Sequence, residues 1–204
     1  MVLGVTGGIA TGKSSVARMF GALGAVVVSA DELAREVVLP GAPALSRLVE
    51  RFGPPVLLKD GTLNRKALAE IIFADPQART DLNAIMHPAI ALLAEQRLRE
   101  LAREPRLIIY EAPLLFEAGA EGRVDAVLVV TAAERQQVRR LMERDEIGEP
   151  AARARIAAQM PLAEKVRRAD YVVDNSGTLP QAEAQVRELF FRLQSHSSAP
   201  VPVP

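Results

Sequence analysis

Residues near the start of the chain match the spacing of a phosphate-binding loop. They run Gly7-Gly8-Ile9-Ala10-Thr11-Gly12-Lys13-Ser14 and fit G-x-x-x-x-G-K-[ST]. A glycine-rich turn leading into a helix directs backbone N–H groups and the positive end of the helix dipole toward phosphates. We expect Lys13 to reach the β- and γ-phosphates, Ser14 to coordinate Mg²⁺, and Ser15 to lie beside the nucleotide. The sequence therefore predicts a site for ATP with Mg²⁺.

Two carboxylates follow predicted strands, at the sheet edge where ligands of open α/β sheets bind. Asp31 follows the second strand and has the chemistry to orient an acceptor hydroxyl and take its proton. The alternative is structural, because Ser29 and Glu32 fit a helix capping box and Asp31 favours the positive helix end. Glu111 ends the third strand, where it either contacts the Mg²⁺ shell through water or is an exposed strand end.

An arginine pair follows the fourth predicted strand. Arg140 and Arg144 are four residues apart and share one helical face. Such a pair can close over a transferring phosphate and neutralise its developing charge. The alternative is a solvated face, because Glu134, Glu143 and Asp145 supply salt-bridge partners nearby.

Two further polar residues have less specific surroundings. His87 precedes Pro88 between two predicted helices, and a lone histidine there is commonly a turn residue. Asn175 follows the last predicted strand, where it either lies near the adenine or serves a turn.

The elements that position these residues follow from hydrophobic patterning. Nearly continuous apolar runs predict buried parallel strands at Val2–Val5, Ala25–Ser29, Leu107–Glu111, Ala126–Val130 and Tyr171–Val173. Helical patterns occur at Ser15–Phe20, Ala44–Phe52, Arg65–Phe73, Gln77–Met86, Ala89–Glu104, Glu134–Asp145 and Ala151–Met160. The alternation predicts an α/β fold, with a five-stranded parallel sheet flanked by helices.

The same pattern predicts one domain over residues 1–195. Its core comprises 1–39 and 106–195, with a helical insertion at about 40–105 and a further helical segment at about 134–160. Residues 196–204 are rich in proline and serine, which predicts a disordered tail.

Composition narrows the functional classes. The 204 residues carry equal numbers of acidic and basic side chains, so we expect no nucleic-acid partner. Absence of cysteine excludes disulfides and thiolate metal sites, and is compatible with a cytoplasmic location. We find no signal peptide and no apolar run near the roughly 20 residues of a membrane helix. Nothing in the sequence indicates a protein partner.

Several segments together resemble the dephospho-CoA kinase family, in family order over nearly the whole chain. They are Thr6–Ile9 with Gly12–Ser14, Ala30-Asp31 with Ala34-Arg35, Pro40-Gly41, Asp60-Gly61 with Leu63 and Arg65, His87-Pro88, Pro113–Glu117, Gln137 with Arg140 and Arg144, Gln159, and Ala169-Asp170 with Asp174-Asn175. The Pro-Leu-Leu-Phe-Glu block and the His-Pro pair are more specific than the phosphate loop. Four positions depart from the family pattern: Ser29 replaces the common aspartate, Ala10-Thr11 the common Gly-Ser, and Ser15 the usual threonine.

The resemblance implies a P-loop kinase core that transfers the γ-phosphate of ATP to the ribose 3′-hydroxyl of dephospho-CoA, the last step of coenzyme A synthesis. It makes the helical insertion at about 40–105 the acceptor-binding part and the helical segment at about 134–160 a lid. It also makes Asp31 the catalytic base and Arg140 a phosphate-binding lid residue. Acceptor contacts are expected at Arg65, His87, Pro113 and Leu114. Two other functions remain open on the residues alone: a kinase of nucleoside monophosphates or small metabolites, and a slowly hydrolysing nucleotide switch.

Overall fold

A computed structural model describes residues 1–197 and divides the chain into two compact units. The first unit contains Met1–Ser29 and the chain from Glu100 onward, and the second contains Ala30–Arg99. The insertion predicted at about 40–105 therefore corresponds to a unit at 30–99. Each unit is described by itself below.

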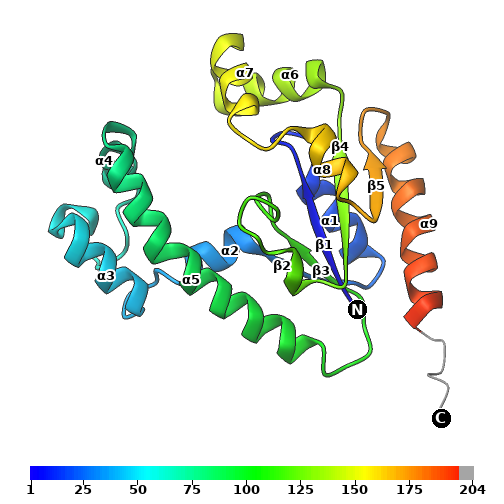
Figure 1. The fold of residues 1–204 in the computed structure, drawn as a ribbon, viewed down its shortest axis with the longest axis horizontal. Coiled ribbons are helices and arrows are strands. Elements are labelled where there is room, and N and C mark those ends of the chain that lie inside the picture. Colours follow the sequence, from blue (N-terminus) through cyan, green and yellow to red (C-terminus); the bar gives the residue numbers. More distant parts are fainter. Residues whose placement is uncertain (198–204) are drawn as a thin grey trace. The chain divides into compact units, whose positions relative to one another are not determined.

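A parallel sheet forms the centre of the first unit (Figure 1). Its order is β2-β3-β1-β4-β5, and every neighbouring pair is parallel. The strands are β1 (Val2–Gly7), β2 (Val26–Ser29), β3 (Ile108–Glu111), β4 (Ala126–Thr131) and β5 (Tyr171–Asp174). The predicted five-stranded parallel sheet is confirmed, and each strand lies within two residues of its predicted bounds. All residues of β1 are buried, which explains their continuous apolar sequence.

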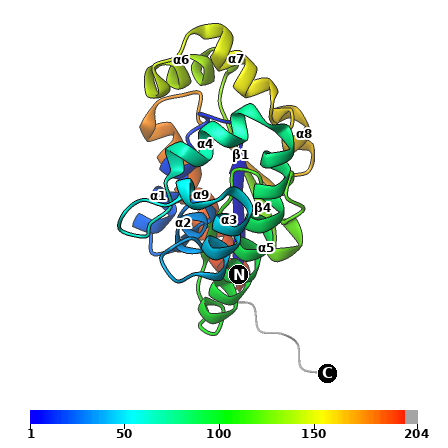
Figure 2. The same ribbon diagram turned by 90° about the vertical axis from the view of Figure 1, so that its left-hand side faces the viewer.

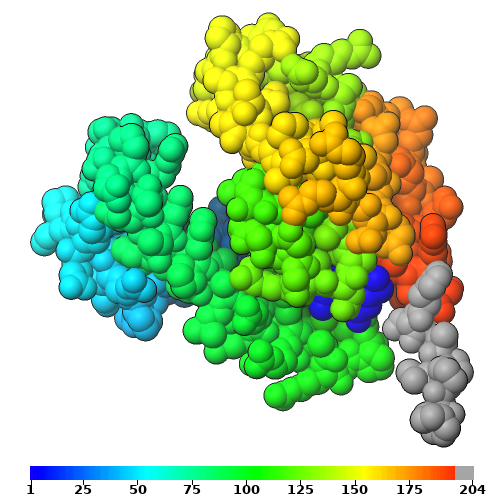
Figure 3. Space-filling model, in the orientation of Figure 1, coloured from blue at the N-terminus to red at the C-terminus, as the bar shows by residue number. Residues whose placement is uncertain are grey.

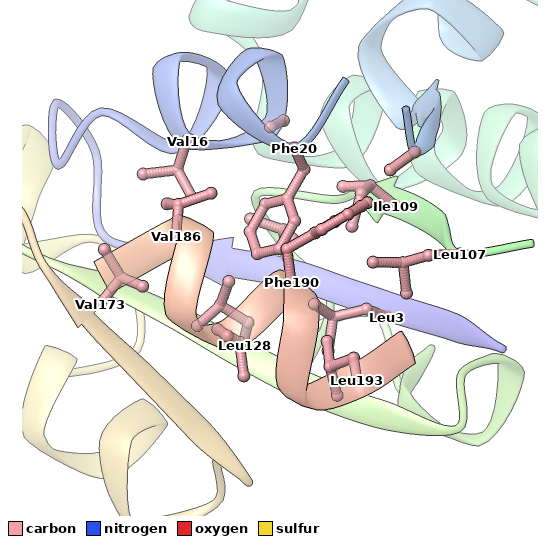
Figure 4. Packing of buried hydrophobic residues seen from close by; sticks show 14 of the residues in the cluster. Leu3, Val16, Phe20, Leu107, Ile109, Leu128, Val173, Val186, Phe190 and Leu193 are labelled. Atoms are coloured by element: carbon pink, nitrogen blue, oxygen red, sulfur yellow. The ribbon is translucent and has the colours of Figure 1, made fainter. Parts of the chain in front are cut away.

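Two helices pack together over one face of this sheet. They are α1 (Lys13–Ala22) and α9 (Leu179–Ser197). Figure 4 shows Phe20 of α1 and Phe190 of α9 meeting above Leu3 and Leu128 of the strands. Leu3 and Val5 both face this cluster, as the two-residue period of a strand requires. The packing fixes the start of α1, and with it the phosphate loop.

Three helices lie between β4 and β5 in the chain. They are α6 (Glu134–Asp145), α7 (Glu149–Ala157) and α8 (Leu162–Arg167). Helices α6 and α7 are adjacent in both ribbon views, and the space-filling view shows them as one lobe of the first unit (Figures 2 and 3). Val138, Leu141 and Ala152 form a small apolar cluster of their own there. A short 3₁₀ turn, η2, spans Glu121–Arg123 after β3.

The second unit is helical. It contains α2 (Ala30–Glu36), α3 (Pro43–Phe52), the 3₁₀ turn η1 (Pro54–Val56), α4 (Arg65–Ala74) and most of α5 (Pro76–Leu101). Its apolar core includes Leu48, Val56 and Leu68. The predicted turn at Asp60-Gly61 is present, because Asp60 accepts a hydrogen bond from the Thr62 amide and Gly61 has a φ of 80°.

One predicted break in this unit is wrong. His87-Pro88 was expected to separate two helices, but α5 continues through both residues. A proline inside a helix removes one hydrogen bond and costs about 3 kcal/mol. Helix α5 buries residues on both sides of the proline, which offsets this local cost: Ala78, Ile85, Ala94 and Leu98.

Helix α9 extends to Ser197, so residues 196 and 197 of the predicted tail belong to it. The rest of that tail, 198–204, lies outside the described residues. Within the described chain, no helix has both the length and the apolar character needed to span a membrane.

Candidate functional site

The phosphate loop connects β1 to α1 in the conformation that its motif predicts. Gly12 caps α1 with a φ of 94°, a left-handed conformation that glycine adopts without a side-chain penalty. Lys13 is buried, and its Nζ donates to the Gly8 carbonyl at 2.8 Å. The Thr11 hydroxyl donates to the same carbonyl at 2.9 Å. These bonds give the loop a defined shape in which Lys13 lies folded over it.

Two residues of the loop meet special constraints. Ala10 has a φ of 59°, which is rare for residues other than glycine, asparagine or aspartate. A Cβ on Gly12 would lie 2.1 Å from Nδ2 of Asn175. That same Nδ2 donates to the Thr11 carbonyl at 2.8 Å. Asn175, for which the sequence left an adenine contact and a turn role open, therefore lies directly on the phosphate loop.

A hydroxyl and a carboxylate meet where α1 begins. Ser14 Oγ donates to Glu111 Oε1 at 2.5 Å, and Glu111 is buried at the end of β3. In the sheet, Glu111 pairs with Ser29, the last residue of β2. Oxygen ligands of this kind suit Mg²⁺, which is usually held by one or two carboxylates together with substrate phosphates. The described residues contain no group of three or more His, Cys, Asp or Glu side chains placed to hold a metal ion.

The two lid arginines occupy different surroundings. Arg140 donates to the Ala10 carbonyl at 3.4 Å and to the Asn175 carbonyl at 3.1 Å, so it lies against the phosphate loop. Arg144 is exposed and pairs with Asp145 at 2.7 Å. The hydrogen bond from Arg144 lowers the pKa of the Asp145 carboxyl, and Arg155 adds a second cationic partner. The structure thus brings Arg140 to the loop and holds Arg144 in a surface ion-pair network.

Two glutamines from the lid segment also contact the loop. Gln159 Oε1 accepts a hydrogen bond from the Ile9 amide at 2.7 Å. Gln137 is buried, donates to the Ala132 carbonyl, and places its Oε1 2.8 Å from where a Cβ on Gly8 would lie. The sequence analysis included both glutamines in the resemblance to the family, but it assigned a structural role to neither.

The segment after β3 is fixed by a buried ion pair. Lys165 is fully buried and binds Glu117 at 2.8 Å and the Pro113 carbonyl at 3.1 Å. Partial burial raises the pKa of Glu117, but hydrogen bonds from Lys165 and backbone amides outweigh it and leave the pKa below its usual value. The Pro113 carbonyl also accepts from Thr6 Oγ1, at the end of β1. Pro113 is therefore tied to the strand that leads into the phosphate loop, and Leu114 beside it is exposed.

Sequence reasoning missed Lys165. A lysine in a short helix is normally exposed, and its partner Glu117 lies 48 positions away, so no local signal distinguishes it. Ser15, predicted to bind nucleotide, lies in the first turn of α1, where its hydroxyl accepts a hydrogen bond from Arg18.

Three predicted site residues belong to the second unit. Asp31 is exposed in the first turn of α2, two positions after Ser29 in the chain. Arg65 is exposed at the start of α4, whose N-cap Asn64 accepts from the Ala67 amide at 3.1 Å. His87 is exposed within α5, so it is a helix residue and not the predicted turn residue.

The family model, a curated relative and a solved structure that match this chain all name the same family. The dephospho-CoA kinase family model matches residues 1–181. A dephospho-CoA kinase from Syntrophotalea carbinolica is 57% identical, and the match covers 99% of this chain and 96% of that protein. Among solved structures, dephospho-CoA kinase from Campylobacter jejuni superposes with a TM-score of 0.77 at 28% identity, covering 96% of this chain and 98% of the other. The protein TT1252 from Thermus thermophilus also gives 0.77, at 35% identity, with 95% and 97% covered.

Proposed function

This chain belongs to the dephospho-CoA kinase family. We propose a specific role in that family's reaction for each residue around its phosphate loop. The activity is ATP-dependent phosphorylation of the ribose 3′-hydroxyl of dephospho-CoA, the final step of coenzyme A biosynthesis. The observation that carries our assignment is the convergence of Lys13, Arg140 and the Ser14–Glu111 pair on one loop of the first unit.

Phosphate binding falls to the loop and the start of α1. Backbone N–H groups of the segment 7–14 and the helix dipole hold the ATP phosphates. Lys13 exchanges its bond with the Gly8 carbonyl for the β- and γ-phosphates, whose negative charge is the stronger acceptor. Asn175 supports the nucleotide through the Thr11 carbonyl that it holds, and Ser15 lies beside the bound phosphates.

Mg²⁺ fits beside this loop because two oxygen donors already meet there. Ser14 would bind the ion directly, with Glu111 as its carboxylate partner. When bound, the ion neutralises charge on the phosphate oxygens.

The lid supplies cationic charge. Arg140 is assigned to the transferring phosphate because its guanidinium already lies against the phosphate loop, at the Ala10 carbonyl. Arg144 contributes when it exchanges Asp145 for the nucleotide. Such charges act chiefly in the transition state, where negative charge is redistributed over the transferring group.

Further residues are assigned to the acceptor. Asp31 acts as the general base that orients the 3′-hydroxyl and accepts its proton. Arg65 and His87 bind the dephospho-CoA from exposed helix positions, and Pro113 with Leu114 contacts it from the segment after β3. Because ATP is the phosphate donor and the chain has no cysteine, we place the reaction in the cytoplasm.

A coupled assay of ADP release tests the proposal. With Mg²⁺ and ATP, dephospho-CoA should stimulate ADP release far above adenosine, AMP or no acceptor. Equal stimulation by AMP would indicate a nucleoside monophosphate kinase. A rate of ADP release that stays the same with every acceptor and without any would indicate a hydrolysing switch. Replacing Mg²⁺ by EDTA should abolish the activity.

A further inference from the structure

The tip of the phosphate loop consists of Ile9 and Ala10. Both residues are held by contacts with the lid segment. The Ile9 amide donates to Gln159 at 2.7 Å, and the Ala10 carbonyl accepts from Arg140 at 3.4 Å. The side chains of Ile9 and Ala10 also pack against the apolar cluster of α6 and α7. Polar and apolar contacts thus join the loop tip to the lid, all within the first unit.

The backbone of this tip needs such support. Ala10 has a φ of 59°, and the left-handed region has a free-energy cost for alanine because its Cβ lies too close to the following carbonyl oxygen. A conformation of that cost persists only where surrounding contacts fix it. The bond to Gln159 holds the Gly8–Ile9 peptide unit, and the bond from Arg140 holds the Ala10 carbonyl, so the strained residue lies between two fixed peptide units.

Gln159 is itself held in place from two sides. The backbone N–H of Gln159 donates to the Ile156 carbonyl at 3.2 Å, which ties the Gln159 backbone to the end of α7. The next residue, Met160, donates its amide to Glu117 at 3.2 Å, and Glu117 is anchored by the buried Lys165. The side chain of Gln159 therefore extends from a fixed backbone to the loop.

We propose that Gln159 is a positioning residue for phosphate transfer, whose side-chain carbonyl holds Ile9-Ala10 in the conformation that the phosphate cradle requires. This inference rests on the kinase function proposed above. Gln159 acts through the loop and transmits the placement of the lid to it. Loss of one such hydrogen bond is worth about 0.5–1.5 kcal/mol, which corresponds to a roughly 2- to 13-fold loss in kcat/KM for ATP.

The test compares Gln159→Leu with Gln181→Leu in steady-state kinetics and thermal unfolding. Gln181 is a matched control, because its Oε1 likewise accepts from a backbone amide, that of Thr178 at 2.8 Å, and none of its hydrogen bonds in the described residues is to the phosphate loop. Gln159→Leu should lower kcat/KM for ATP by about 2- to 13-fold and leave the KM for dephospho-CoA unchanged. Gln181→Leu should leave both kinetic constants unchanged.

A second substitution separates positioning from general destabilisation. Ala10→Gly removes the penalty for a left-handed φ, so it should restore part of the activity lost in Gln159→Leu. A merely structural role of Gln159 would show as a lower melting temperature with no such rescue. If Gln159→Leu does not fold, Gln159→Asn serves instead, because it keeps an amide that is too short to reach Ile9.

Two results would overturn the inference: kinetic constants of Gln159→Leu equal to those of the unmodified protein, or a kinetic loss shared by Gln181→Leu. Either result leaves the proposed function standing so long as the unmodified protein phosphorylates dephospho-CoA. Failure of the unmodified protein to do so would instead refute the proposed function.

Discussion

The ion pair between Lys165 and Glu117 offers a direct test of how the site is held together. We expect Glu117→Gln to lower the free energy of unfolding, because it leaves the Lys165 ammonium fully buried without a counter-charge. The amide retains one acceptor oxygen for Lys165 or for the Met160 amide, so the change removes charge while nearly preserving shape.

The magnitude follows from the burial of the two partners. Removing the charge of one partner in a fully buried ion pair costs about 3–5 kcal/mol, because the other charge stays buried without a partner. The Glu117 side chain is 23% exposed, so water reaches the pair and the cost should fall to about 2–4 kcal/mol at pH 7. Adding Lys165→Met should recover most of this loss, because the double variant buries no charge and the Pro113 carbonyl keeps its bond from Thr6.

Urea unfolding followed by circular dichroism measures these differences. Glu143→Gln is the matched control, because Glu143 pairs with Arg139 at 3.8 Å on a surface where both side chains are 69% exposed. An exposed pair of this kind contributes about 0.5 kcal/mol or less.

The pH dependence has a definite sign. The pKa of Glu117 is lowered in the folded protein, so its ionised form stabilises the fold above the ordinary carboxyl pKa near 4.5. That contribution is lost as the pH falls through the lowered value. The stability difference between the unmodified protein and Glu117→Gln should therefore shrink below about pH 4.5. A loss at pH 7 no larger than that of Glu143→Gln, or a difference that does not change on acidification, would refute the reasoning.

Four further substitutions, one of them made on the background of another, test the phosphate loop and the acceptor base. Lys13→Ala should lower kcat by about 10²-fold or more in steady-state assays, with a smaller loss of ATP affinity by calorimetry. Asp31→Asn should keep its free energy of unfolding within about 1 kcal/mol of the unmodified protein, because it removes only one charge from the first turn of α2, yet it should transfer phosphate at least about a hundredfold more slowly; near-normal turnover would leave Asp31 only its interaction with the helix dipole. Gly12→Ala should cost about 2 kcal/mol in urea unfolding, because its Cβ would displace Asn175, and Asn175→Ala should relieve part of that cost.

The sequence predicted the strands and the phosphate loop well because both depend on local pattern. Every residue of β1 and β3 is buried, so their apolar runs carry no competing amphipathic signal. The loop motif needs only its glycines, Lys13 and Ser14 at fixed spacing between a strand and a helix. The break predicted at Pro88 was wrong for the converse reason, because packing along α5 offsets a local proline penalty that sequence rules treat as decisive.

The contacts that the sequence did not predict join residues far apart in the chain. Arg140 reaches Ala10 across 130 positions, and Asn175 reaches Thr11 across 164. The i, i+4 spacing of Arg140 and Arg144 predicts a shared face, but Arg144 pairs with Asp145, which also binds Arg155, in a separate surface network. Strand order decides such contacts, since β4 and β5 carry the segments that lead to Arg140 and Asn175.

These distant contacts affect how the loop presents its donors to phosphate. In a trans peptide the carbonyl and the following N–H point in opposite directions. Asn175 holds the carbonyl of Thr11, so the amide of Gly12 points away from the Asn175 side chain. The amide of Thr11 instead donates within the loop, to the Gly8 carbonyl at 3.4 Å, while Arg140 holds the carbonyl of Ala10. An anion cradle needs free N–H groups turned toward the anion, and here a side chain from outside the motif helps to set the direction of the Gly12 amide. The glycines permit the loop conformation, while α6 and the end of β5 help to select it.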